Sequence, residues 1–321
     1  MMNAPRAFAQ HTSPLRGVWA EHVSMAGHVS WRAGGVARRT YTPAGLDDLA
    51  AMLADLPVSE PVMFVGLGSN LLVRDGGFDG TVVFLHAALN ELRVEDEPAD
   101  SAPLIYVEAG VASPKVARFA ANLGCDAAFL AGIPGTIGGA LAMNAGCYGA
   151  EIWPYVQKVC TIDRQGMRHI RLPAAYDIAY RHVAARDAAQ ADDVFAAAWL
   201  QFPVLDTTVA RQQIKALLEK RVASQPLRWP NAGSVFRNPP GDFAARLIEA
   251  AGLKGLRVGG AEVSNVHANF IVNDDGSATA ADIEQLIHTV QSRVAAATGI
   301  QLIREVRIVG DALPTSSLTG S

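Results

Sequence analysis

The sequence predicts an α+β chain with two structural units, for three reasons. Short apolar runs alternate with stretches of helical periodicity along most of the chain. Its 321 residues suggest two domains, or one domain with a large appendage, and are ample for a substantial core. Predicted short strands also give way to longer predicted helices near residues 200–206, where we expect the boundary between the two units.

In the first half, apolar runs bounded by turn residues predict strands at 62–65, 81–85, 104–108, 156–162 and 168–172. The last two are expected to form a pair that turns at Gln165-Gly166. A helix is expected to begin with Ser113 as its N-cap and Pro114 in its first turn. It runs to about Leu123, and Gly124 ends it.

Beyond the boundary, the sequence predicts three helices and a final strand, at 207–223, 243–251, 280–297 and 300–309. Thr207 or Thr208 can cap the first helix. Asp242 precedes the second helix, and Gly252 is its C′ residue. The last helix carries one apolar stripe, formed by Ile283, Leu286, Ile287, Val290 and Val294.

Composition excludes several classes of function. A net charge of −4 gives no reason to expect nucleic acid or an anionic membrane as partner. The N-terminus lacks the apolar segment of a signal peptide. Residues 127–150 are long and uncharged enough to span a bilayer, but their glycines, Pro134 and Asn144 would leave backbone groups unsatisfied in lipid. Three cysteines without CxxC spacing favour a reduced, cytoplasmic setting over disulfides or zinc: Cys125, Cys147 and Cys160.

Two glycine-rich segments suggest a cradle for a cofactor. Residues 131–149 hold six glycines and no charge, a density that gives tight turns and a backbone open to close approach. Residues 66–73 follow an apolar strand, and their Ser69 and Asn70 can donate hydrogen bonds to phosphate oxygens. This segment does not match the Rossmann fingerprint, because Leu71 stands in place of the third glycine. The Gly-Lys-Ser/Thr of a Walker loop occurs nowhere in the sequence. An ordinary tight turn is its alternative, although two such turns suit a long ligand with a diphosphate.

In the second half of the chain, candidate functional residues are most concentrated in the segment 230–240. A turn there can present Ser234, and Arg237 and Asn238 supply a cation and an amide close by. Since Gly-x-Ser-x-Gly is absent, Ser234 fits a proton donor or a ligand contact better than an acylated nucleophile. A turn or capping serine is the ordinary alternative. Taken singly, three other residues also have ordinary structural explanations: Arg181, His267 and Glu305.

In this order, the segments closely resemble the UDP-N-acetylenolpyruvoylglucosamine reductases, the flavoenzyme family that completes UDP-N-acetylmuramate in bacterial cell-wall synthesis. The most specific part is Ala-Gly-Ile-Pro-Gly-Thr-Ile-Gly-Gly with Met-Asn-Ala-Gly, followed by Asn-Ala-Gly-Ser-Val-Phe-Arg-Asn-Pro. The likeness runs from about residue 30 to residue 310, through the segments 66–73, 131–151, 180–181, 221–239, 255–262, 267–273 and 305–306.

The resemblance implies a two-part FAD-binding domain of the vanillyl-alcohol-oxidase type, followed by a substrate-binding α+β domain. The corresponding ranges are an N-terminal extension at 1–22, two lobes at about 23–90 and 91–203, a substrate domain at 204–310 and a flexible tail at 311–321. FAD is implied as a non-covalent cofactor and NADPH as the hydride donor. The FAD contacts implied are Gly66, Gly68, Ser69, Asn70, Leu71, Gly132, Ile133, Pro134, Gly135, Thr136, Gly138, Gly139, Asn144 and Gly146.

By the same resemblance, Arg181 and Glu305 stabilise an enolate-like intermediate, and Ser234 gives a proton to C2 of the enolpyruvyl group. Such charge stabilisation needs donors that are fixed in a dry pocket. The substrate contacts implied are Arg221, Gln225, Asn238 and His267. The protein is expected to be a cytoplasmic monomer that binds the enolpyruvyl nucleotide sugar.

The chain departs from the family pattern at three places. Residues 32–37 lack a common proline, and Val183 stands where a serine is common. The stretch 183–202 has little room for a tyrosine-bearing insertion, which indicates the shorter subclass. Two alternatives stay open: a flavin oxidase of the same fold that acts on an alcohol or lactone, and a nucleotide-sugar-binding module without activity.

Overall fold

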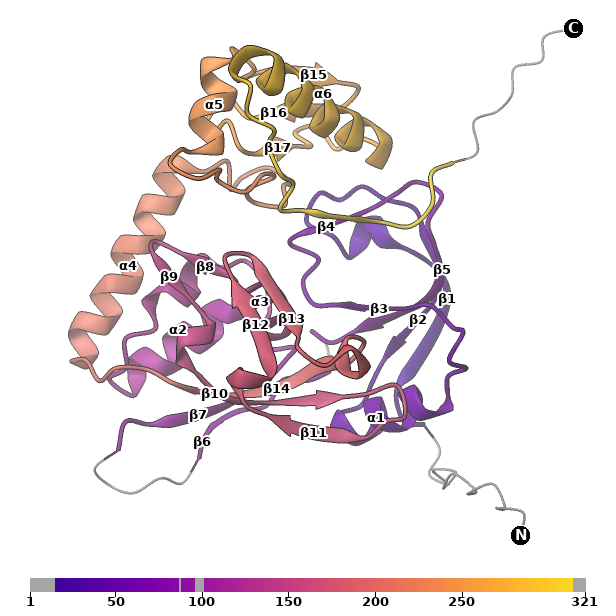
Figure 1. Cartoon of the computed structure of the whole chain (residues 1–321), viewed down its shortest axis with the longest axis vertical. Helices are drawn as coiled ribbons and strands as arrows, with labels where there is room; N and C mark the ends of the chain where they lie inside the picture. Colours follow the sequence, from indigo (N-terminus) through magenta and orange to yellow (C-terminus); the bar gives the residue numbers. More distant parts are fainter. Residues whose placement is uncertain (1–14, 87, 96–100, 314–321) are drawn as a thin grey trace, which may run out of the picture.

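The computed structural model describes residues 15–86, 88–95 and 101–313. Residues 1–14 of the expected extension and 314–321 of the expected tail lie outside the described residues. The described chain forms two lobes that carry a smaller third unit, and a long helix runs up to this unit along one side (Figure 1). None of the described helices is long and apolar enough to cross a membrane.

The first lobe is built on a four-stranded mixed sheet. Its strands, in spatial order, are β1 (Val18–Ser24), β2 (Val36–Thr42), β5 (Phe78–Phe84) and β3 (Val62–Val65). Helix α1 (Leu46–Asp55) buries Leu49, Met52 and Leu53 in a core shared with the sheet of the second lobe. Strand β1 begins inside the expected N-terminal extension. Nearly all of its side chains are exposed, so no apolar alternation marked it.

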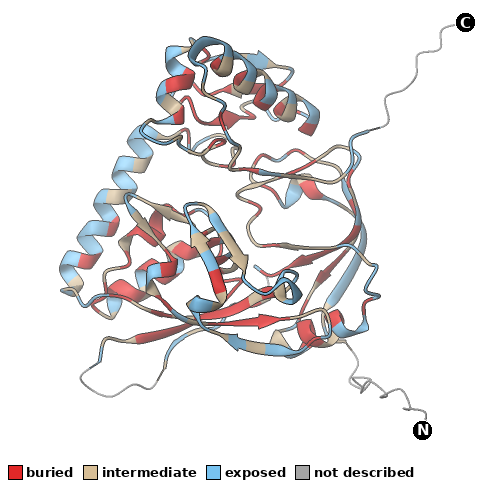
Figure 2. Cartoon of the chain, viewed as in Figure 1, coloured by how far each residue is buried: buried red, intermediate tan, exposed pale blue. Residues whose placement is uncertain are grey.

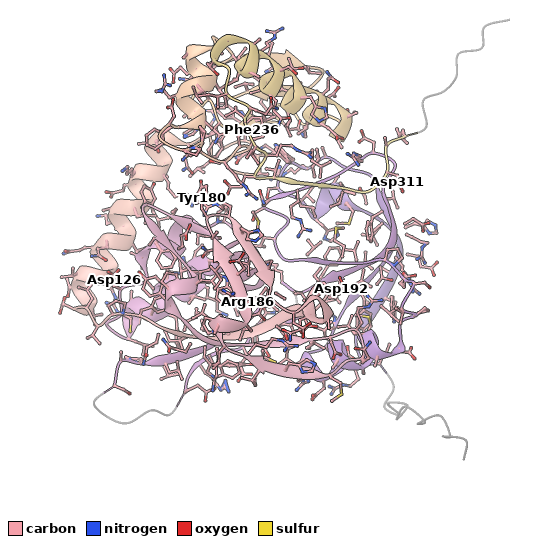
Figure 3. The ribbon with its side chains drawn as sticks, in the orientation of Figure 1. Asp126, Tyr180, Arg186, Asp192, Phe236 and Asp311 are labelled. Atoms are coloured by element: carbon pink, nitrogen blue, oxygen red, sulfur yellow. The ribbon has the colours of Figure 1, made fainter. Side chains whose placement is uncertain are left out.

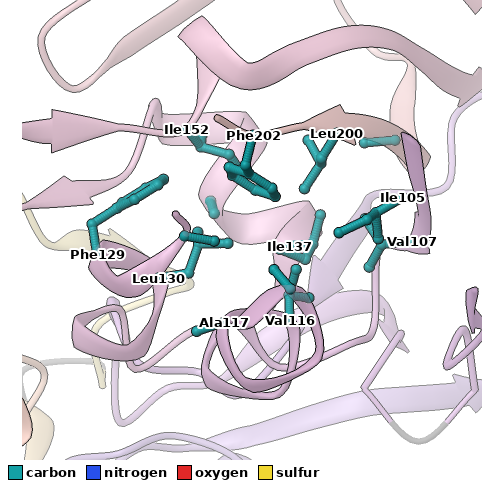
Figure 4. Packing of buried hydrophobic residues seen from close by; sticks show 14 of the residues in the cluster. Ile105, Val107, Val116, Ala117, Phe129, Leu130, Ile137, Ile152, Leu200 and Phe202 are labelled. Carbon is teal, nitrogen blue, oxygen red and sulfur yellow. The ribbon is translucent and has the colours of Figure 1, made fainter. Parts of the chain in front are cut away.

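The second lobe is built on a five-stranded antiparallel sheet. Its strands, in spatial order, are β11 (Arg168–Arg171), β10 (Val156–Ile162), β14 (Val194–Gln201), β7 (Leu104–Glu108) and β6 (Leu92–Val94). Helices α2 (Ser113–Asn122) and α3 (Ile137–Met143) pack with the sheet around a core that Figure 4 shows from nearby. Gly166 has φ of +77° at the expected turn between β10 and β11. Two short hairpins complete the lobe: β8 (Gly146–Cys147) with β9 (Ala150–Glu151), and β12 (Tyr176–Ala179) with β13 (His182–Ala185).

Short 3-10 helices follow or join several strands of both lobes. They are η1 (Met25–Gly27), η2 (Ala128–Gly132), η3 (Trp153–Tyr155), η4 (Pro173–Ala175) and η5 (Ala188–Gln190). η2 lies directly before the Pro134-Gly135 turn, so most of the glycine-rich run is a chain of short turns and one short helix.

The C-terminal unit packs two helices with a small sheet. Its elements are α5 (Ala244–Ala250), β15 (Arg257–Val258), β16 (Ala261–Val263), β17 (Ile271–Val272) and α6 (Ala280–Thr298). All five residues of the predicted apolar stripe of α6 are buried (Figure 2). Gly252 follows α5 with φ of +69°, as expected of a C′ residue.

Two elements join the C-terminal unit to the rest of the chain. Helix α4 (Thr207–Ser224) contributes Ala210 and Ile214 to the core of the second lobe, so by packing the boundary between units follows this helix instead of preceding it. Strand β18 (Arg307–Val309) pairs in parallel with β4 (Leu71–Val73) of the first lobe.

The predicted ends of three elements differ from the observed ones. Asp206 caps α4, because its carboxylate reaches the amides of Thr208 and Val209, and Thr207 is already helical. Ser113 is the first residue of α2 and makes no cap hydrogen bond. The final strand is shorter than predicted, since only residues 307–309 form a ladder and Arg304 makes an isolated bridge.

Candidate functional site

The two glycine-rich turns lie against each other. The first turn follows β3, and a side chain at Gly66 would collide with Thr136 of the second turn. Ser69 also lies close to Gly135, whose hypothetical Cβ would lie 3.2 Å from the serine oxygen. The small residues predicted to form a cradle are therefore neighbours in space, although about 65 residues separate them in the sequence.

The surface between these turns fits a cofactor with a diphosphate. A side chain at Gly139 would meet only Thr136 Oγ1, at 3.9 Å, so the exposed face of α3 is bare there. Within the described residues, the amides of Ser69, Gly135 and Thr136 donate to no backbone carbonyl. Unpaired amides beside a bare backbone are what a diphosphate requires. FAD is thus compatible with the residues present.

Several of the expected FAD contacts have protein neighbours instead of open space. Side chains at Gly68, Gly138 and Gly146 would strike the protein's own backbone or Ala109, and one at Gly132 would strike Cys147. These glycines permit the turns to pack together. Their direct contact with a cofactor stays a prediction, as it does for Ile133, Pro134 and Leu71.

Arg181 lies at the tip of the β12–β13 hairpin. The two strands pair up to Ala179 and His182, which leaves Tyr180 and Arg181 as a two-residue turn, with φ of +55° at Arg181. This hairpin points toward the C-terminal unit, and Figure 3 labels Tyr180 on the hairpin and Phe236 in that unit. Arg181 donates to the Asn144 carbonyl at 3.3 Å and to the Gly146 carbonyl at 2.9 Å. The guanidinium is therefore fixed by the second glycine-rich segment.

Glu305 completes an ion pair across the two units. Its Oε1 accepts from Arg181 Nε at 2.7 Å, and both side chains are only 15% exposed. Its backbone carbonyl accepts from Asn70 Nδ2 at 3.1 Å, so the first glycine-rich turn also holds it. Burial raises the pKa of the Glu305 carboxyl above its usual value, and the cations Arg181 and Arg237 oppose that rise.

The Ser234 segment pairs with the segment that carries Glu305. The Glu305 amide donates to the Val235 carbonyl at 2.8 Å, and Phe236 forms a bridge with Arg304. Asn269 clamps the same segment, because its side chain donates to the Phe236 carbonyl and accepts from the Phe236 amide. Among the described residues, the Ser234 hydroxyl has no hydrogen-bond partner and is free to meet a ligand.

A cavity of about 270 Å³ lies where the units meet. Ser69 and Pro134 of the two glycine-rich turns line it, together with Arg221 and Gly233 from the other side. Further lining residues that the sequence analysis did not single out are Ser30, Arg32, Leu227, Arg228, Trp229 and Phe270. The pair Arg228-Trp229, stacked with 4.2 Å from guanidinium to ring, carried no motif and could be found only in three dimensions.

The four predicted substrate contacts, Arg221, Gln225, Asn238 and His267, differ in how far the protein already uses their side chains. Arg221 donates to Gln225 Oε1 at 3.1 Å, so these two act together at the end of α4. Asn238 caps α5 through Ala244 and leaves its amide nitrogen unbonded among the described residues. His267 accepts from the Asn269 amide and lies edge-on to Phe270, which is the ordinary structural use of a histidine.

Asn144 was expected to contact the cofactor, and in the structure its side chain is hydrogen-bonded to other residues of the protein. It is 1% exposed and adopts φ of +45° after the last turn of α3. Its Nδ2 donates to Glu151 at 2.7 Å and to the Ala179 carbonyl at 3.1 Å. The side chain therefore ties α3 to the strand that leads to Arg181.

Comparison with known proteins gives a consistent picture. Residues 37–170 match the FAD-binding domain family, and residues 225–309 match the family described as UDP-N-acetylenolpyruvoylglucosamine reductase, C-terminal domain. The chain is 53% identical to the UDP-N-acetylenolpyruvoylglucosamine reductase of Thiobacillus denitrificans, over 94% of this chain and 95% of that protein. It is 50% identical to that of Legionella pneumophila, over 95% and 98%. The reductase structure from Thermus caldophilus superposes with a TM-score of 0.73 at 28% identity, over 91% and 98% of the two chains.

Proposed function

Since the chain belongs to the UDP-N-acetylenolpyruvoylglucosamine reductase family, we propose that it reduces UDP-N-acetylglucosamine enolpyruvate to UDP-N-acetylmuramate. It is an FAD-dependent oxidoreductase that uses NADPH. The observation that best supports a working site is the buried pair Arg181–Glu305, which lies beside the Ser234 segment and the glycine-rich turns.

Bound FAD supplies hydride transfer, from NADPH to C3 of the enolpyruvyl group. Addition at C3 leaves negative charge on C2 and the adjoining carboxylate. In our proposal, Arg181 carries the positive charge that stabilises it, since backbone carbonyls orient its guanidinium. Glu305 orients Arg181 and offers a carboxyl that can share a proton. The free hydroxyl of Ser234 then donates the proton to C2.

The substrate's nucleotide part needs a cationic surface. We propose that Arg221, held by Gln225, contacts its diphosphate in the cavity that Ser69 and Pro134 also line. Asn238 is proposed as a further substrate contact through its unbonded amide nitrogen. His267 does not line this cavity, so its proposed contact rests on the family resemblance alone.

We further propose that the protein works as a monomer in the cytoplasm, in peptidoglycan precursor synthesis. The cysteines Cys125, Cys147 and Cys160 are unpaired, which suits a reducing compartment. Light scattering at micromolar concentration tests the monomer, and a stable dimer would contradict it. Fluorescent tagging in the source cells tests the location, and signal confined to the envelope would contradict it.

The activity is tested by an absorption spectrum and two half-reactions. Purified protein should be yellow, NADPH should bleach it anaerobically, and the enolpyruvyl nucleotide sugar should restore the colour. Stoichiometric peroxide without that substrate would favour a flavin oxidase instead. Substrate binding without any bleaching would favour an inactive binding module. Replacing Glu305 by Gln should slow recovery of the colour, and an unchanged rate would remove this carboxyl from the mechanism.

A further inference from the structure

A second cation lies beside Glu305, on the segment that carries Ser234. The Arg237 amide donates to the Ile303 carbonyl at 2.9 Å. The neighbouring bond in this pairing joins the Glu305 amide to the Val235 carbonyl, two residues away on each segment. In this antiparallel pairing, alternate residues share one face, so Arg237 and Glu305 are diagonal neighbours on the same face. Diagonal neighbours lie roughly 7–8 Å apart, within reach of long side chains.

The guanidinium of Arg237 has an unusual environment. Its Nε is buried and has no hydrogen-bond partner in the structure. In the described residues, no carboxylate forms an ion pair with it at bonding distance. Its positive charge acts on the carboxyl of Glu305, where it opposes the rise in pKa caused by burial. The residue is half-buried, and a partly desolvated cation is stabilised by a nearby carboxylate, which gives this position a reason to be coupled to Glu305.

The charged groups that face Glu305 come from two elements. Arg181 approaches from the β12–β13 hairpin and makes the direct ion pair, and Arg237 approaches from the segment paired with the Glu305 strand. The site therefore holds two positive charges against one carboxylate. A substrate carboxylate would balance the second positive charge, so the same arrangement also suits the substrate proposed above.

We propose that Arg237 is a positioning residue of the reductase site, whose charge sets the pH at which Glu305 takes up its proton. This inference rests on the proposed function only in giving that proton a role in the reaction. Arg237 acts through Glu305 and need not touch the substrate. The sequence pattern pointed to Ser234 in this segment, and only the strand register relates Arg237 to a residue 68 positions away.

The test is an infrared titration of the Glu305 carboxyl in the FAD-loaded protein without substrate. The band of the protonated carboxyl is identified as the one that Glu305→Gln removes. Arg237→Gln keeps a donor but loses the charge, so the midpoint should move up by about one pH unit. Arg237→Lys restores the charge and should return the midpoint to that of the unchanged protein. Arg304→Gln is the matched control, because it removes a charge from the same strand pair and should leave the midpoint in place.

The pH profile of substrate-driven flavin reoxidation gives the second readout. The limb that reports Glu305 should move to higher pH in Arg237→Gln by the same amount as the infrared midpoint. An unmoved infrared midpoint, or an equal shift in Arg304→Gln, overturns the proposal. A shifted midpoint with an unmoved profile overturns the link to the reaction. Absence of any reductase activity would contradict the proposed function, while the infrared result would still decide the coupling.

Discussion

Replacing Asn144 by Ala should destabilise the protein strongly, through two separable effects. The side chain is buried, and its two shorter hydrogen bonds go to Glu151 and to the Ala179 carbonyl. Leaving buried partners unpaired costs about 1–3 kcal/mol each, and we take a total of about 2–4 kcal/mol because Glu151 is partly hydrated. Alanine at φ of +45° adds about 1 kcal/mol of backbone strain.

The matched variant Asn144→Gly isolates the first effect, because glycine adopts positive φ freely. Urea unfolding should give a free-energy loss of about 3–5 kcal/mol for Ala and about 1 kcal/mol less for Gly. Both variants should also slow flavin reoxidation by substrate, since the Asn144 carbonyl and the Ala179 strand hold Arg181. A loss below about 1 kcal/mol in both variants would refute this account of the side chain. Equal losses for Ala and Gly would refute the strain.

Three further predictions concern other residues. In Ser234→Ala, NADPH should still bleach the flavin while substrate-driven reoxidation slows by about 10²–10⁴-fold; equal loss of both half-reactions would indicate a folding or flavin-binding defect. Leu286→Ala, in the fully buried stripe of α6, should lower the free energy of unfolding by about 2–5 kcal/mol in urea; exposed Leu218→Ala is the control and should change it little. Burial lowers the pKa of His267, so the unfolded chain binds the proton more readily. Stability should therefore be complete above pH 6.5 and fall as the pH drops below it, and this slope should flatten in His267→Gln.

Hydrophobic periodicity and turn residues predicted the parts of the fold that depend on neighbouring residues in the sequence. The stripe of α6, the glycine that ends α5 and the turn at Gly166 were all read correctly from periodicity and turn residues. Strand β1 escaped prediction because an exposed edge strand shows no alternation. The cap of α4 is Asp206, because its carboxylate accepts from the amides of Thr208 and Val209, which makes Thr207 the first helical residue.

The sequence pointed to candidate site residues but not to their arrangement, and the roles of these residues stay predictions. Arg181 and Glu305 were both identified, yet each alone fitted a surface residue, and only the folded chain makes them a buried pair. Asn144 was expected at the cofactor from the family resemblance. Its buried side chain, at positive φ, is hydrogen-bonded to Glu151 and to the Ala179 carbonyl, so a direct contact with the cofactor stays a prediction. Cavity residues such as Arg228 carried no spacing signal, because they meet the glycine-rich turns only through packing between units.

The parallel pairing of β18 with β4 has a consequence for biosynthesis. The first glycine-rich turn is held by Asn70, whose partner is Glu305, and the ladder that follows uses residues 307–309. A nascent chain therefore cannot make these contacts until residues 305–309 have left the ribosome. These contacts are strongly non-local, because the C-terminal strand pairs with a segment more than 230 residues earlier in the chain. A product that ends before residue 305 would lack the partner of Asn70 and the strand that pairs with β4.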